Sequence, residues 1–96
     1  MIVVRDVFQA KYGKTNDLVE LFKEAKRSFP EVGYSRILTD ACGPFFTVIA
    51  EAEVDSLGVW EQRLSEIFSH PEFPTWFSRM EDLVESGRRE FYNIAG

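Results

Sequence analysis

The segment 45–54 constrains the fold of this chain most strongly, because its side chains alternate with a period of two. One alternating set is entirely apolar, while the other mixes apolar and polar residues and includes Glu51 and Glu53. Successive side chains of a β-strand point to opposite faces of a sheet. The segment is therefore predicted to be a strand with one face against a core. The apolar set consists of Phe46, Val48, Ala50, Ala52 and Val54.

The half of the chain before this strand predicts two strands and one helix. Residues 2–10 are rich in β-branched and aromatic side chains and are apolar on both alternating faces, which indicates a strand covered on both sides. Apolar residues at helical spacing then predict a helix that begins near Thr15 or Asn16 and ends at Pro30. A further strand is expected over residues 32–39. The short connection after it predicts an antiparallel hairpin.

The half of the chain after this strand predicts two helices and one strand. Asp55–Ser56 is expected to cap a helix that the His70–Pro71 pair interrupts. A third helix should follow and end at Gly87, since glycine is common just beyond helix ends. The last strand is expected over residues 88–94.

This order of elements, β-α-β-β-α(α)-β, predicts an α+β, ferredoxin-like sandwich with an antiparallel sheet, built as a single domain over residues 1–96. Helices would cover one face of the sheet. The other face is expected to carry Phe45, Ile49 and Phe8, which is too apolar a set to face water. We therefore expect a second copy to cover that face, so that the homodimer forms an α+β barrel with a cavity.

Charge and composition exclude several classes of function. The chain has 16 acidic and 11 basic residues and a net charge of −5, which argues against nucleic acid as a partner. No apolar run is long enough to span a membrane. Cys42 is the only cysteine, so an internal disulfide is excluded and a cytoplasmic location is expected. One histidine and one cysteine match no familiar zinc pattern.

Four stretches of the chain resemble the dimeric α+β barrel superfamily, and the NIPSNAP-like branch in particular. They are the turn Lys11–Lys14, the Gly43–Pro44 pair, the strand-to-helix passage 51–60 and the segment His70–Phe77. Antibiotic-biosynthesis and haem-degrading monooxygenase-like domains are related branches. The resemblance implies a dimeric barrel. It leaves the function open, because this fold hosts enzymes as well as proteins without a known activity.

The resemblance also suggests three candidate catalytic residues. Haem-degrading members use an Asn on the first strand, a Trp on the helix after the third strand and a His further along. The matching positions are Asp6, Trp60, and either His70 by spacing or Phe77 by alignment of the last helix. Asp6 departs from this pattern, because an ionised carboxylate cannot donate the hydrogen bond that an amide can. The alternative is that Trp60 belongs to the core and that His70 is a surface residue at a helix junction.

Asp6 is notable without any resemblance, since it interrupts an apolar strand. A buried carboxylate needs a partner or a raised pKa. It is therefore either a general base in a cavity or the structural partner of Arg5, Arg36 or Arg89.

Further residues are expected to line a ligand pocket inside the barrel. Glu51 and Thr47 share the mixed face of their strand, and Arg36 on the neighbouring strand would make a polar patch with them. The alternative for Glu51 is an ordinary ion pair across the sheet. The full set of predicted pocket residues is Phe8, Tyr34, Arg36, Thr47, Ile49, Glu51 and Phe77.

These patterns predict a protein that binds a small apolar or aromatic molecule in a cavity of the barrel. The alternative is a cofactor-independent or haem-linked enzyme of the monooxygenase-like type. No catalytic motif is complete, so the sequence leaves open whether the protein is an enzyme, which cofactor it uses and whether haem binds.

Overall fold

The computed structural model describes all residues from 1 to 96 and has the predicted order of elements. The elements are β1 (Ile2–Ala10), α1 (Thr15–Ser28), a 3-10 turn (Pro30–Val32), β2 (Tyr34–Thr39), β3 (Thr47–Val54), α2 (Leu57–Phe68), α3 (Phe73–Leu83) and β4 (Val84–Asn93). The expectation of an α+β, ferredoxin-like fold is thus confirmed.

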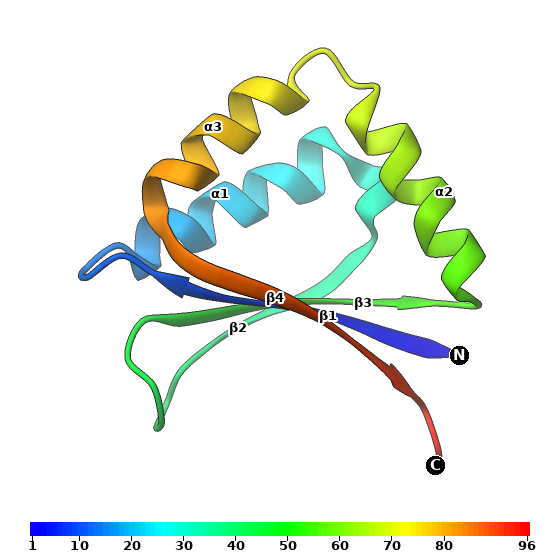
Figure 1. Cartoon of the computed structure of the whole chain (residues 1–96), viewed down its shortest axis with the longest axis horizontal. Coiled ribbons are helices and arrows are strands. Elements are labelled where there is room, and N and C mark those ends of the chain that lie inside the picture. Colours follow the sequence, from blue (N-terminus) through cyan, green and yellow to red (C-terminus); the bar gives the residue numbers. More distant parts are fainter.

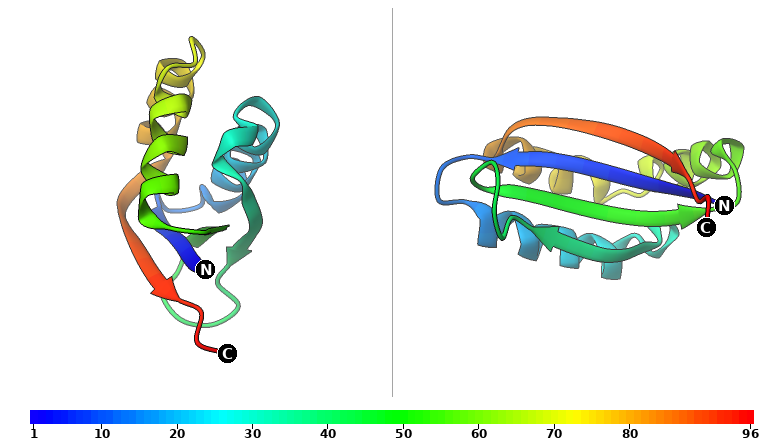
Figure 2. Two further views of the ribbon diagram at one scale, coloured as in Figure 1. Left: turned by 90° about the vertical axis from the view of Figure 1, so that its right-hand side faces the viewer. Right: turned by 90° about the horizontal axis from the view of Figure 1, so that it is seen from below.

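The four strands form one antiparallel sheet in the order β2-β3-β1-β4. All three helices lie over one face of this sheet, which we call the helix-covered face (Figure 1). Figure 2, in its right-hand view from below, shows the strands in front of the helices, so that the opposite, uncovered face carries no element of the chain. Because β1 and β3 are the central strands, their residues decide what lies beneath the helices.

The core is built where helix stripes meet the helix-covered face. Val4 of β1 and Val48, Ala50, Ala52 and Val54 of β3 are almost fully buried there, as the alternation predicted, whereas Phe46 is half-buried. They pack against Leu18, Leu21 and Phe22 of α1 and against Trp60 of α2. No helix combines the length and apolar content needed to cross a membrane.

Helix capping follows the sequence at one helix and not at another. The hydroxyl of Ser56 accepts a hydrogen bond from the amide of Val59 at 3.2 Å, so the predicted cap of α2 is present. The residue before α1 is Lys14, whose side chain makes no capping hydrogen bond.

The predicted helix stop at Gly87 is wrong. The helix α3 ends at Leu83 and passes directly into β4, because Val84 already pairs with Ala10 in the sheet. Gly87 lies opposite Phe8 in the β1–β4 ladder. A Cβ atom at this glycine would lie 2.5 Å from the Phe8 ring, so the missing side chain makes room for that ring.

The faces of two phenylalanines were also predicted incorrectly. Phe8 lies on the helix-covered face, where its ring packs 5.3 Å from that of Phe22. Phe45 is outside β3 and 78% exposed. The strand begins only at Thr47, because Phe46 has a φ of 60°, a left-handed conformation that an extended strand cannot contain.

The second strand is shorter than predicted at its start. Residues Pro30–Val32 form a 3-10 turn, and Gly33 follows with a φ of 64°. This left-handed glycine reverses the chain into β2 at Tyr34.

Candidate functional site

A cavity lies between the helices and the helix-covered face of the sheet, with a volume of about 150 Å³. Its walls come from every helix, and aromatic rings dominate them. Asp6 and Arg89 are the only lining residues that are not hydrophobic. The others are Phe8, Phe22, Ala25, Phe29, Val32, Tyr34, Trp60, Leu64, Ile67, Phe68, Phe73, Trp76, Phe77 and Met80.

The sheet supplies a polar floor to this cavity. Asp6 is at the centre of β1 and is 2% exposed. Arg89 stands directly opposite it on β4, and its Nε and Nη2 donate to the two carboxylate oxygens at 2.5 and 3.2 Å. The hydroxyl of Tyr34, from β2, donates to Asp6 Oδ2 at 2.9 Å. Both oxygens of the buried carboxylate are therefore occupied by donors from the two edge strands.

The electrostatics of this floor raise the pKa values of Tyr34 and Arg89. Burial and the negative charge of Asp6 raise the pKa of Tyr34 well above its ordinary value, so the phenol stays protonated. Burial opposes the charge on Arg89, but the hydrogen bonds and the charge of Asp6 outweigh it and raise the pKa of Arg89. A carboxylate that is tied to a guanidinium in this way is a counterion rather than a free base.

Two tryptophans line the cavity, and they differ in one respect. The indole Nε1 of Trp76 donates to the backbone oxygen of Leu21 at 2.9 Å. The indole Nε1 of Trp60 is buried and has no hydrogen-bond partner, although its ring lies 5.1 Å from the guanidinium carbon of Arg89. Almost all buried donors in proteins have a partner, so the unpartnered N–H of Trp60 is an exception in this structure.

The predicted pocket residues divide between the two faces of the sheet. Phe8, Tyr34 and Phe77 line the cavity, as do Asp6 and Trp60. By contrast, Arg36, Thr47, Ile49 and Glu51 are on the uncovered face and make no part of it.

Glu51 forms the centre of an ion cluster on that uncovered face. It is 3% exposed, and the Nε atoms of Arg5 and Arg36 each donate to one of its oxygens at 2.7 Å. Burial by itself raises the pKa of Glu51, but the hydrogen bonds from Arg36 and Arg5 outweigh it, and the net effect is a lowered pKa. The cross-strand ion pair weighed for Glu51 is therefore present, with a second arginine added.

His70 lies away from the cavity wall. Its Nε2 is 3.0 Å from Glu31 Oε1, and its ring packs edge-on against Phe29 at 5.2 Å. A backbone hydrogen bond and the His70 side chain together lower the pKa of Glu31. These contacts tie the junction between α2 and α3 to the 3-10 turn.

Haem does not fit the residues that the structure brings together. The cavity volume corresponds to about one aromatic ring, whereas haem is a four-ring macrocycle. His70 faces Glu31 rather than the cavity. Apart from haem, no three His, Cys, Asp or Glu side chains of the chain gather as a group that could hold a metal ion.

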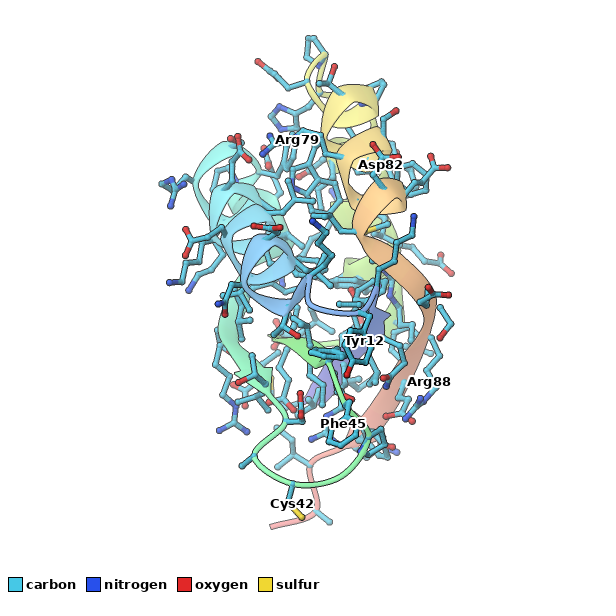
Figure 3. The ribbon with its side chains drawn as sticks, turned by 90° about the vertical axis from the view of Figure 1, so that its left-hand side faces the viewer. Tyr12, Cys42, Phe45, Arg79, Asp82 and Arg88 are labelled. Carbon is cyan, nitrogen blue, oxygen red and sulfur yellow. The ribbon has the colours of Figure 1, made fainter.

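Cys42 belongs to no part of this site. Figure 3 shows it at the tip of the loop between β2 and β3, on the opposite side of the sheet from the helices. Its thiol is exposed.

Several cavity residues were not predicted as site residues. Phe73, Trp76 and Met80 line the cavity from α3, where helical spacing puts them on the face that packs against the core. Periodicity identifies which residues face inward, but it cannot distinguish a filled core from a cavity. The density of aromatic residues, 15% of the chain, was the one available signal.

Comparisons with solved structures establish the fold. An uncharacterised NIPSNAP domain protein from Burkholderia xenovorans superposes with a TM-score of 0.89 at 13% identity, over 99% of this chain and 95% of that one. A NIPSNAP family protein from Agrobacterium tumefaciens gives 0.85 at 19% identity, over 96% and 90% of the two chains. A cofactor-independent oxygenase from Streptomyces nogalater gives 0.70 at 12% identity, over 99% and 93%.

No protein-family model matches the chain, and no curated protein matches it in sequence. At such low identities the structural matches show a shared fold. The predicted resemblance to NIPSNAP-like and antibiotic-biosynthesis monooxygenase-like domains is confirmed at that level.

Proposed function

We propose that this protein binds a small apolar or aromatic molecule in the cavity beneath its helices. The observation that carries the proposal is the cavity itself, which is lined by aromatic rings and closed below by a neutralised ion pair. Two other hollows in the surface have larger volumes, about 370 and 330 Å³, but their linings are mostly polar. Small-molecule sites are typically apolar with a few placed polar groups, and only the first hollow meets that description.

Burial of apolar surface would drive binding. Removal of apolar surface from water contributes roughly 25 cal/mol per Å², and 14 of the 16 residues that line the cavity are hydrophobic. A ligand of matching shape would therefore gain binding free energy before any polar contact is made.

The alternative function is a cofactor-independent oxygenase. The shared fold with the oxygenase from Streptomyces nogalater favours it, and so does a polar floor beneath an apolar cavity. The bonding of Asp6 is unfavourable to it, because three hydrogen bonds hold the carboxylate against Arg89 and Tyr34 and leave only one lone pair, on Oδ1, for a proton of the substrate. Turnover of quinols that is lost in Asp6→Asn would support the enzyme. Binding without turnover across such compounds would favour the binding protein.

We also propose that the protein is a homodimer joined through the uncovered face of the sheet. That face carries apolar side chains on the central strands, namely Val3, Val7 and Ile49, around the buried Glu51. Val3 and Ile49 are only half-buried in the single chain, and a second copy packed on this face would bury them. Light scattering of Ile49→Glu should then give a monomer, whereas Leu57→Glu, at an exposed position on α2, should leave the dimer intact.

A cytoplasmic location stays a prediction from the sequence, and the exposed free thiol of Cys42 is compatible with it.

Native mass spectrometry tests both parts of the proposal. The chain has a mass of 11.1 kDa, so a dimer would be measured at twice that value, and a bound molecule as a constant added mass. Ala25 lines the cavity and is almost fully buried, so Ala25→Leu should fill the space and abolish the added mass. Ala41→Leu, at an exposed loop position, is the matched control. An added mass that persists in Ala25→Leu would show that the molecule binds elsewhere.

A further inference from the structure

We propose that Gly87 sets the size of the ligand that the cavity accepts, because it leaves room for the ring of Phe8 over the backbone of β4. The inference rests on the proposed function and concerns the same cavity. It gives a positioning role to a residue that does not itself line the cavity.

The backbone does not require a glycine at position 87. Three other glycines of the chain, Gly13, Gly33 and Gly43, have positive φ angles, which glycine adopts readily, and Gly87 is not among them. A glycine inside a strand weakens the strand, and it often marks a place that another group approaches closely. At Gly87 that group is the ring of Phe8.

The ring of Phe8 occupies the space that a side chain at position 87 would take. Phe8 lies opposite Gly87 in the β1–β4 ladder. A Cβ atom at Gly87 would lie 2.5 Å from Cδ1 and 2.7 Å from Cε1 of this ring. Carbon atoms in contact are about 3.5–4.0 Å apart, so a methyl group at this position would displace the ring by roughly 1 Å.

The displaced ring would move into the cavity, because the other directions are unfavourable. Phe8 lines the cavity, and it also packs against the core cluster that contains Phe22 and Val48, which are 1% and 0% exposed. A close-packed core yields to such a shift only with strain. Rotation of the half-buried ring outward would expose more of its apolar surface to water. The cavity is the space that remains.

The consequence is a limit on the ligand. An apolar cavity of about 150 Å³ holds a molecule of the size of benzene, so a shift of one wall by roughly 1 Å removes an appreciable part of its length. With glycine at position 87 the ring of Phe8 stays over β4 and the cavity keeps its full length. Any larger residue would select for a shorter ligand.

A series of alkylbenzenes, from benzene to butylbenzene, measures this limit in the intact protein. Isothermal titration calorimetry gives a dissociation constant for each probe. Each added methylene group that fits should strengthen binding about fourfold, and the gain should stop at the first chain that is too long. In Gly87→Ala the gain should stop at least one carbon earlier. Gly58→Ala is the matched control and should keep the original limit, because a Cβ atom there meets no atom closer than 3.8 Å.

A second substitution separates positioning from support of the fold. Phe8→Leu replaces the ring by a smaller side chain, so the double variant Gly87→Ala/Phe8→Leu should again bind the longer probes. The inference is overturned if Gly87→Ala weakens all probes equally and keeps the limit, or if the double variant does not restore it. The binding function still stands in both cases.

Two further outcomes are decisive. If the unaltered protein binds none of the probes, the inference fails, and the proposed function fails with it when the native protein also carries no added mass. Should Gly87→Ala not fold, Phe8→Leu alone decides. Its limit should be at least one carbon longer than that of the unaltered protein, and an unchanged limit overturns the inference.

Discussion

Replacing Asp6 by asparagine tests whether this residue is a structural counterion. The substitution keeps the shape of the side chain, removes its charge, and replaces one acceptor oxygen by a donor. That donor would face either the guanidinium of Arg89 or the hydroxyl of Tyr34, both of which are themselves donors. The mutant would therefore lose hydrogen bonds and leave the positive charge of Arg89 without its partner.

The expected loss can be worked from burial. Removing one partner of a buried ion pair costs about 3–5 kcal/mol. The Arg89 side chain is 37% exposed, so water solvates part of the released charge and the loss should fall at or just below the lower end of this range. We expect Asp6→Asn to lower the free energy of unfolding by about 2–3 kcal/mol, which corresponds to a fall of roughly 10–20 °C in Tm for a domain of this size.

Urea denaturation followed by circular dichroism measures this loss, and Asp17→Asn is the matched control. Asp17 has an exposed side chain, 3.9 Å from Lys14 Nζ, so the same substitution there should cost less than about 1 kcal/mol. A loss below about 1 kcal/mol in Asp6→Asn, at an unchanged m-value, would refute the assignment as a counterion. It would also restore the general-base hypothesis.

Three further predictions concern other parts of the molecule. Gly87→Ala should destabilise the fold by about 1–3 kcal/mol in urea denaturation, because its Cβ would lie 2.5 Å from the ring of Phe8, whereas Gly58→Ala, with no atom closer than 3.8 Å, should not. The raised pKa of Tyr34 contributes stability that is present below its ordinary value of 10.0 and lost as the pH rises beyond it, so Tyr34→Phe should flatten the alkaline fall in Tm. The lowered pKa of Glu51 contributes stability that is present above the ordinary pKa of 4.5 and is lost as the pH falls through the folded-state pKa. Glu51→Gln should therefore make Tm fall less steeply with decreasing pH. An unaltered slope would contradict the ion cluster.

The elements were predictable because β3 and the helices each bury one side. Burial of one side makes apolar residues recur at the period of the strand or of the helix. The faces of β1 were harder to assign. Both of its alternating sets are apolar, so nothing in the strand says which set the helices cover, and Phe8 was given to the wrong face. The end of α3 was misplaced for a related reason: the pairing of β4 with β1 overrides the signal of Gly87.

The candidate site was predictable as a set of unusual residues and not as an arrangement. Asp6 was recognisable as a carboxylate in an apolar strand, and Arg89 was among its three possible partners. The choice between these partners depends on the register of β1 against β4, which places Asp6 opposite Arg89. The two strands are far apart in the sequence, so no local pattern reveals this register. The unpartnered N–H of Trp60 is a property of the folded molecule alone, since the sequence shows two tryptophans at helical positions without distinguishing them.

The central position of β1 has a consequence for how the chain folds. The first strand pairs with β3 and β4, and the bond from Arg89 to Asp6 joins residues 83 positions apart. Closing loops of this length before their contacts form is slow, so we expect folding on the millisecond-to-second scale. Until β4 docks, the Asp6 carboxylate lacks its partner Arg89. Burial of an unpaired charge is costly, so β1 stays exposed to water at that stage. Docking of β4, the last strand of the chain, therefore allows β1, the first strand, to be buried away from water.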